Sequence, residues 1–211
     1  MKNRFTSEKE GVKLAREFCE LFKKGIPCSL DLFCVVGGVE KAARLDLGNE
    51  LIPKQQIKKI VSFLKENEIP HTIINQMLYV LAPQTENPEQ DFKVLERALK
   101  LKGVKDWKSK EEFHRLLGEF FGIPKSAIED FIKDQFELST ASAIGPAFSL
   151  PQFRANLFAG FHYNRETRDK EVLEIIKRKE AFIKKYFPYL YRRWIEVQKF
   201  IDKEVYGRKK F

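Results

Sequence analysis

The sequence predicts a mostly helical α+β protein with one small sheet, and three observations support this class. Residues 30–81 contain short apolar runs rich in strand-forming residues, separated by glycine and proline. From Asn87 onward, the apolar residues recur at helical spacing instead. The chain has 211 residues, 43% of them apolar, so it is long enough to bury a sizeable core. We expect an α+β domain at 1–136 and a basic, aromatic helical region at 137–211, which either stands apart or packs as part of one domain.

The first helix is predicted to follow Ser7, which makes a capping box with Glu10 ahead of apolar residues on one helix face. Gly25 and Pro27 are expected to end this helix. The apolar run at 30–36 comes next and is predicted as a strand, because it is short, rich in strand-forming residues and stopped by two glycines.

The following segments carry both strand and helix signals. Residues 39–47 fit either a helical turn or a second strand. Pro53 suits the first position of a helix that Pro70 closes, because proline fixes φ and lacks an amide hydrogen. Residues 71–81 read as β structure, and the Asn75-Gln76 pair midway leaves a hairpin and one continuous strand equally open.

Three further helices are predicted from their capping residues and stop signals. In order, Asn87-Pro88 starts a helix through Leu101, Ser109 with Glu112 caps one through Phe121 that Gly122 ends, and Ser126 with Glu129 caps one ending near Asp134.

The segment 137–151 is long, made mostly of small residues and without charge after Glu137. An ordinary solvated loop carries more charge, so we predict a domain boundary or the lining of a pocket. Two helices are expected beyond it, at about 166–186 and 189–205, with Pro188 forcing a kink or a break between them.

The positive charge of the chain is concentrated in its C-terminal part. The net charge at pH 7 is +9, of which residues 151–211 carry +8 and residues 1–150 carry +1. The same 61 residues hold 13 of the 27 aromatic side chains. A segment that is both cationic and aromatic is typical of nucleic-acid binding.

The cysteines and the apolar runs point to a cytosolic protein. Cys19, Cys28 and Cys34 are odd in number and show no zinc-site spacing, which predicts three free thiols in a reducing compartment. The charged N-terminus lacks the apolar core of a signal peptide, and no apolar run approaches the roughly 20 residues that cross a bilayer. We therefore expect no membrane partner. Abundant Lys, Glu, Phe and Ile fits a thermophile.

Two short motifs resemble those of a known family. Residues 117–124 read Leu-Gly-Glu-Phe-Phe-Gly-Ile-Pro, and residues 37–45 read Gly-Gly-Val-Glu-Lys-Ala-Ala-Arg-Leu. They resemble an uncharacterised archaeal family with an L-G-x-x-L-G-Y-P-x-C-C motif and a G-V-x-P-A-A-R stretch. Ser126 and Ala127 stand here in place of the cysteine pair, and Lys41 replaces the proline. The resemblance therefore implies no thiol-based role and supplies no reaction.

Signatures of metal and cofactor chemistry are missing from the sequence. The three histidines are far apart, and no H-E-x-x-H, H-x-H or Asp-rich loop is present, so we predict neither a metal nor a cofactor. The Gly37-Gly38 turn has Lys41 and Arg44 nearby but lacks the phosphate-loop patterns, which favours a turn that simply needs a positive φ. Cys34 is expected to pack in the core. Whether the protein is an enzyme stays open.

Each of the two C-terminal helices is predicted to have an apolar stripe and a basic face. At 100° per residue, the apolar side chains from Val172 to Phe187 fall on one stripe, and most of the cations lie opposite. Such faces either follow a phosphate backbone or are merely solvated. Any of Tyr189, Tyr191 and Tyr206 that is exposed would stack on bases. The predicted nucleic-acid-binding residues are Lys177, Lys184, Lys185, Arg192, Lys199 and Lys203.

A second hypothesis places an anion pocket beside the 137–151 segment. Arg154, His162 and Tyr163 follow that segment and offer an anion donor, a general acid or base and a hydrogen-bonding group. Lys179 falls inside the apolar stripe, where a lysine usually snorkels to solvent and otherwise is buried with a partner. We predict that these four side chains converge on one anion. The competing interpretation is that His162 and Tyr163 cap or pack the following helix.

The sequence leaves three functions open and favours the first. The leading prediction is weak binding of RNA or single-stranded DNA through the C-terminal basic helices. One alternative is a small-molecule enzyme or anion-binding protein with a pocket near 137–164. The other is a homodimeric interaction module in which Trp194 and Phe200 lie near the contact between two copies.

Overall fold

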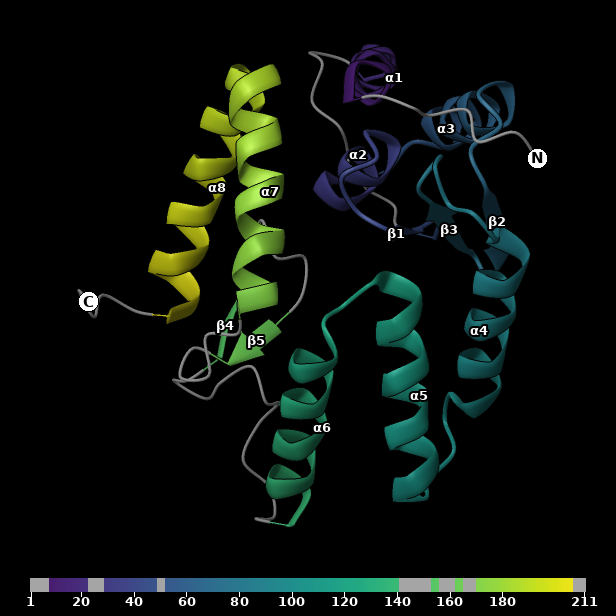
Figure 1. Ribbon diagram of the computed structural model, residues 1–211, viewed down its shortest axis with the longest axis vertical. Coiled ribbons are helices and arrows are strands. Elements are labelled where there is room, and N and C mark those ends of the chain that lie inside the picture. Colours follow the sequence, from purple (N-terminus) through teal and green to yellow (C-terminus); the bar gives the residue numbers. More distant parts are fainter. Residues whose placement is uncertain are drawn as a thin grey trace. The chain divides into compact units, whose positions relative to one another are not determined.

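The computed structural model of the protein describes residues 8–22, 29–48, 52–140, 153–155, 162–164 and 170–206. Within these ranges it contains eight helices, one three-stranded sheet and one two-stranded sheet (Figure 1). The predicted class, mostly helical α+β, is therefore confirmed. The chain divides into two compact units, Met1–Ile128 and Glu129–Phe211.

The sheet of the first unit is antiparallel, with strand order β1-β3-β2. Its strands are β1 (Ala42–Asp46), β2 (His71–Ile74) and β3 (Met77–Leu81). The turn between β2 and β3 is Asn75-Gln76, with φ values of 50° and 63°. Positive φ at both positions gives the two-residue turn whose twist matches the flanking strands. Of the two alternatives for residues 71–81, the hairpin is the one observed.

The apolar run after Ser29 is helix α2 (Leu30–Val36), so the strand prediction for these residues is wrong. The Ser29 hydroxyl caps the helix by accepting a hydrogen bond of 3.2 Å from the amide of Leu32. Every apolar side chain of α2 is buried. A segment buried on all sides has no polar face, so its sequence lacks the period that separates helix from strand. Residues 39–47, for which two structures were open, contain strand β1.

Helices cover both faces of the three-stranded sheet (Figure 1). On one side lie α1 (Glu8–Glu20), α2 and α3 (Lys54–Glu66), and the ring centroids of Phe18 on α1 and Phe63 on α3 are 5.5 Å apart. On the other side lie α4 (Pro88–Leu101) and α5 (Trp107–Phe121), which pack together as a helical hairpin.

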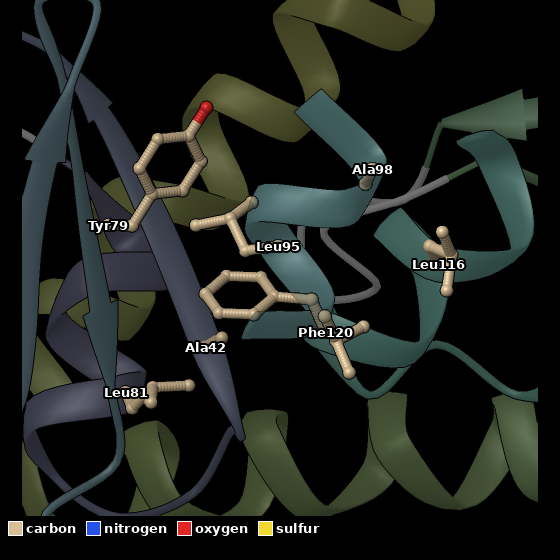
Figure 2. Packing of buried hydrophobic residues seen from close by; sticks show 8 residues of the cluster. Ala42, Tyr79, Leu81, Leu95, Ala98, Leu116 and Phe120 are labelled. Carbon is tan, nitrogen blue, oxygen red and sulfur yellow. The ribbon is translucent and has the colours of Figure 1, made fainter. Parts of the chain in front are cut away.

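The core on the α4–α5 side joins the sheet to this helical hairpin (Figure 2). The Phe120 ring meets Tyr79 edge-on, with the centroids 6.0 Å apart. Both rings are almost fully buried. The buried members of this cluster are Ala42, Tyr79, Leu81, Val94, Leu95, Ala98, Leu116 and Phe120.

Two of the predicted helix caps are wrong. Helix α5 is capped by Asp106, whose carboxylate accepts a hydrogen bond of 2.9 Å from the amide of Ser109. This hydrogen bond lowers the pKa of Asp106. Helix α6 (Lys125–Thr140) begins before Ser126, so Ser126 lies inside its first turn. At α5 the sequence offers both Asp106 and Ser109 as capping residues, and the helix begins after the first of them.

The second unit contains most of α6, strands β4 (Phe153–Ala155) and β5 (His162–Asn164), and helices α7 (Lys170–Tyr186) and α8 (Pro188–Tyr206). Helices α7 and α8 lie side by side (Figure 1). The predicted break between the two C-terminal helices is confirmed, because α8 starts at Pro188. Most of the 137–151 segment, at 141–151, lies outside the described residues, and with it the predicted boundary or pocket lining.

Candidate nucleic-acid interface

Helix α7 has one buried face and one charged face. Val172, Ile176, Phe182 and Ile183 are buried, as the predicted apolar stripe requires. The opposite side of the helix is exposed. Among the predicted nucleic-acid-binding residues, Lys177, Lys184 and Lys185 lie on this exposed side.

Helix α8 continues the same division. Leu190 and Trp194 are buried, while Arg192 and Lys199 are exposed. Lys203 also lies on α8, but its side chain is outside the described part of the structure, as is that of Phe200. Trp194 is only 7% exposed in the single chain, so its apolar surface is covered without a second copy.

The exposed surface of α7 and α8 is strongly cationic. Over the side chains described between 170 and 199, eight exposed cations face three exposed carboxylates. The α4–α5 hairpin serves as a comparison, because residues 88–121 hold seven exposed Lys and Arg against five exposed Asp and Glu. The exposed cations of α7 and α8 are Lys170, Lys177, Arg178, Lys184, Lys185, Arg192, Arg193 and Lys199, and the exposed carboxylates are Glu171, Glu174 and Glu196.

Two contacts between α7 and α8, along the line where the helices meet (the seam), fix the axial alignment of one helix against the other. The Tyr191 hydroxyl donates a hydrogen bond of 2.7 Å to Glu180, which raises the pKa of Tyr191. The Lys184 Nζ lies 5.8 Å from the centroid of the Tyr191 ring. The last turns of α7 therefore lie beside the first turns of α8.

This alignment places exposed cations in two tiers along the axis of the helix pair. Lys184 and Arg192 form the tier nearer the break between the helices. Lys177 and Lys199 each lie seven residues further from that break, on α7 and α8 respectively. Seven residues of α-helix span about 10.5 Å, so the second tier lies about that far from the first.

One tyrosine of this surface has a largely exposed ring. Tyr189, in the first turn of α8, is 55% exposed. Tyr191 is half-buried, with its hydroxyl bonded to Glu180. The side chain of Tyr206 is outside the described residues. Tyr189 is therefore the exposed tyrosine available for base stacking, and it lies at the start of α8, three residues before Arg192.

The residues of the predicted anion pocket lie in two places. Strands β4 and β5 pair so that Arg154 is opposite Tyr163, while His162 is opposite Ala155. Adjacent pairs of a ladder belong to opposite faces, so the register puts the positions of Arg154 and His162 on different faces. Lys179 lies on the buried face of α7. No contact between Lys179 and the strand pair is described, and their convergence stays a prediction.

Lys179 itself is 0% exposed, so the common outcome, a lysine that reaches solvent, does not occur here. Its neighbours on the buried face of α7 include Ile176, Phe182 and Ile183. A buried ammonium is stable only when hydrogen-bonded or paired, because removing the charge from water is costly. The side chain therefore marks a polar position inside an otherwise apolar face.

The pocket hypothesis predicts that an anion stabilises the protein through Lys179. A thermal-shift screen of nucleotides, sugar phosphates and carboxylates is expected to find a ligand that stabilises the wild type by about 2.7 kcal/mol at a hundredfold excess over Kd. Lys179→Met should lose this shift, and Lys184→Met, an exposed control on the same helix, should keep it. The hypothesis fails if no anion raises the Tm, or if Lys179→Met is more stable than the wild type and responds identically.

The Gly37-Gly38 turn has its amides already occupied. The amide of Gly37 donates to the Phe33 carbonyl at 3.0 Å, and that of Gly38 to the Val35 carbonyl at 2.9 Å. Gly38 has φ +73°, a conformation that suits glycine. The interpretation of this pair as a turn that needs a positive φ is confirmed.

Lys41 and Arg44 do not join that turn in a phosphate site. The Lys41 Nζ lies 2.8 Å from the Asp91 carboxylate and donates a hydrogen bond of 3.0 Å to the carbonyl of Glu119. Lys41 therefore ties the start of β1 to α4 and to the last turn of α5, where helix carbonyls favour a cation. Arg44 is exposed on β1, where its charge partly offsets the burial that raises the pKa of Tyr79.

The described part of the chain shows no feature of a thiol-based site, a metal site or a membrane-spanning helix. Burial, with a smaller contribution from Glu20, raises the pKa of Cys19 to about 12, which disfavours the reactive thiolate. Cys34 is buried, as expected, and Cys28 is outside the described residues. No group of three His, Cys, Asp or Glu side chains that could hold a metal occurs there. None of the described helices has both the length and the apolar character needed to cross a membrane.

The fold and the site define an α+β protein with a basic helical hairpin. Comparison of the chain with protein-family models, with curated proteins and with solved structures finds no match.

Proposed function

We propose that the protein binds single-stranded RNA or DNA, without sequence preference, through the basic faces of α7 and α8. The observation that carries this proposal is the excess of eight exposed cations over three exposed carboxylates on these two helices. A linear polyanion complements such a surface, because neutralising its phosphates releases condensed counterions.

The two tiers suit a strand that runs along the seam between the helices. Their separation of about 10.5 Å corresponds to roughly three stacked nucleotides at about 3.4 Å each. Side chains on both sides of the seam can therefore contact phosphates of one strand. None of these contacts reads a base edge, so the binding is expected to be sequence-neutral.

Tyr189 adds a platform for a base at one end of this track. Its exposed ring lies in the first turn of α8, three residues before Arg192, and an aromatic ring stacks on any base. Stacking of this kind contributes about 1–3 kcal/mol per base. Cations and an aromatic ring together distinguish a nucleic-acid surface from a solvated lysine-rich face.

Charge reversal on α7 and α8 is expected to abolish binding at low salt. If about five phosphates are contacted, log K falls with log salt at a slope of about −3.5. The variant Lys177→Glu, Lys184→Glu, Lys185→Glu and Lys199→Glu should weaken binding to a dT oligonucleotide at least tenfold and flatten this slope. Fluorescence anisotropy across a salt series measures both quantities, and circular dichroism checks that the variant stays folded.

A matched control makes the same charge change on the α4–α5 hairpin. Lys93, Lys100, Lys102 and Lys110 are exposed there, and their replacement by Glu should change affinity less than the α7–α8 variant does. Tyr189→Ala should weaken binding to the oligonucleotide but not to heparin, which has no bases to stack. Equal losses in the two lysine variants, or no binding by the wild type at low salt, would contradict the proposal.

A further inference from the structure

A second basic surface lies on the first unit, along helix α3. The helix is held by its apolar side, where Ile60, Phe63 and Leu64 are buried. On the same side, the Gln56 side-chain amide donates a hydrogen bond of 2.9 Å to the carbonyl of Leu21. These contacts fix which face of α3 is turned to solvent.

The solvent face of α3 carries an aligned row of lysines. Lys54, Lys58 and Lys65 are exposed and fall within about 40° of one another at 100° per residue, opposite the buried residues. We call these three residues the α3 stripe. Eleven residues separate its ends, or about 16.5 Å along the helix axis. Gln55 and Ser62, also exposed, lie on its flank.

The stripe has no acidic partner on its own helix. Lys54 and Lys58 are four residues apart, a spacing at which like charges repel, and within α3 neither has a carboxylate three or four residues away. Elsewhere such positions hold ion pairs, as Lys13 with Glu17 on α1 and Arg115 with Glu111 on α5. Among the described contacts, no ion pair involves the stripe.

The stability of the helix does not explain this arrangement either. Lys54 occupies the first turn, where the helix dipole favours a carboxylate over a cation. Lys54 and Lys58 repel each other and Lys54 stands at the unfavourable end, which costs the helix stability, whereas Lys65 in the last turn suits the dipole. A bound anion would remove this cost.

We propose that the α3 stripe is a second nucleic-acid-binding surface, so that both units of the protein contact one strand. The ligand chemistry is a linear phosphate backbone, matched by the extended row of cations, with Gln55 and Ser62 as hydrogen-bonding groups for sugar or phosphate oxygens. A membrane surface fits poorly, because the exposed face of α3 has no apolar side chain to insert between lipids. The two-unit contact rests on the proposed function of α7 and α8.

Two contacts on one strand make affinity depend on its length. Once a strand is long enough to reach both surfaces, the second contact is intramolecular and adds affinity without a new binding site. A strand too short to reach both gains nothing. The wild type should therefore show a step in affinity as the strand is lengthened, beyond the gradual rise that more overlapping positions give.

The test uses the full chain with dT oligonucleotides from 6 to 40 nucleotides, followed by fluorescence anisotropy. The variant Lys54→Glu, Lys58→Glu and Lys65→Glu should remove the step and weaken binding of the longest strand at least tenfold. The control Lys93→Glu, Lys100→Glu and Lys110→Glu makes the same charge change within the first unit and should keep the step. Glutamate at position 54 suits the helix dipole, and circular dichroism verifies folding of both variants.

The outcomes separate this inference from the proposed function. If the α3 variant keeps the step or matches the control variant, the α3 surface is not a nucleic-acid site. If the α7–α8 variant binds like the wild type while the α3 variant loses affinity, the proposed function fails and the α3 site stands. If the α3 variant loses affinity for polyglutamate but not for dT, the stripe recognises an acidic peptide and the inference is wrong.

Discussion

Replacing Phe120 by alanine is expected to lower the free energy of unfolding of the first unit by about 3–5 kcal/mol. The ring is 0% exposed and lies in the cluster that joins the sheet to α4 and α5 (Figure 2). It contacts Tyr79 edge-on and lies 6.2 Å, centroid to centroid, from Phe92. Truncation removes these contacts and leaves a cavity, because the sheet and two helices around it cannot all move inward.

Phe121 provides a matched control for this substitution. It is the next residue on α5 but only half-buried, at the edge of the same cluster. Phe121→Ala should cost less than half as much. The chain has two tryptophans, Trp107 on α5 and Trp194 on α8, so urea unfolding in a Trp194→Phe background reports the first unit through Trp107. Equal losses for Phe120→Ala and Phe121→Ala would place the centre of the core elsewhere.

Gly11→Ala is expected to destabilise the first unit by about 3 kcal/mol, although alanine is the better helix former by about 1 kcal/mol. Gly11 is the fourth residue of α1, where propensity alone predicts stabilisation. A Cβ at this position would overlap the carbonyl oxygen of Gly37 and approach its carbonyl carbon to 3.2 Å. The obstacle is backbone at the end of α2, which is anchored by its own hydrogen bonds and cannot rotate away.

Gly118→Ala is the control, because it makes the same chemical change inside another helix of the same unit. The atoms that its Cβ would meet belong to the Ile128 side chain, which can shift by more than backbone can although its χ1 is restricted in a helix. We expect this variant to lose less stability than Gly11→Ala in the same urea experiment. If Gly11→Ala proves more stable than the wild type, α1 does not approach the end of α2 as closely as the structure shows.

The buried faces of the amphipathic helices were determined by the sequence alone. The apolar period set the buried face of α7, whereas Asn75-Gln76 marked a turn position but left the β2–β3 hairpin and one continuous strand equally open. Both signals are local, because each depends on residues within a few positions of one another. The exposed positions of Lys177, Lys184 and Arg192 followed from the same period.

Helical periodicity also predicts the α3 stripe from the sequence, but the net charge of residues 1–150 conceals it. Residues 1–150 have a net charge of only +1, since the acidic residues of other elements offset the lysines of α3. The spacing of Lys54, Lys58 and Lys65 on one helix face is the signal that identifies the stripe. The net charge of a long region therefore conceals a basic surface. The positions of the charged residues around one helix reveal it.

Only the tertiary structure decided what depends on partners far apart in the sequence. The run at 30–36 became a helix because it is enclosed on every side, and an enclosed segment has no polar face to show its period. Lys41 contacts α4 through Asp91 and α5 through the carbonyl of Glu119, which is 78 residues away in the sequence. Tyr189 rather than Tyr191 has the exposed ring because Glu180, on the preceding helix, holds the Tyr191 hydroxyl. In each case, an interaction across the fold decided what the local sequence did not.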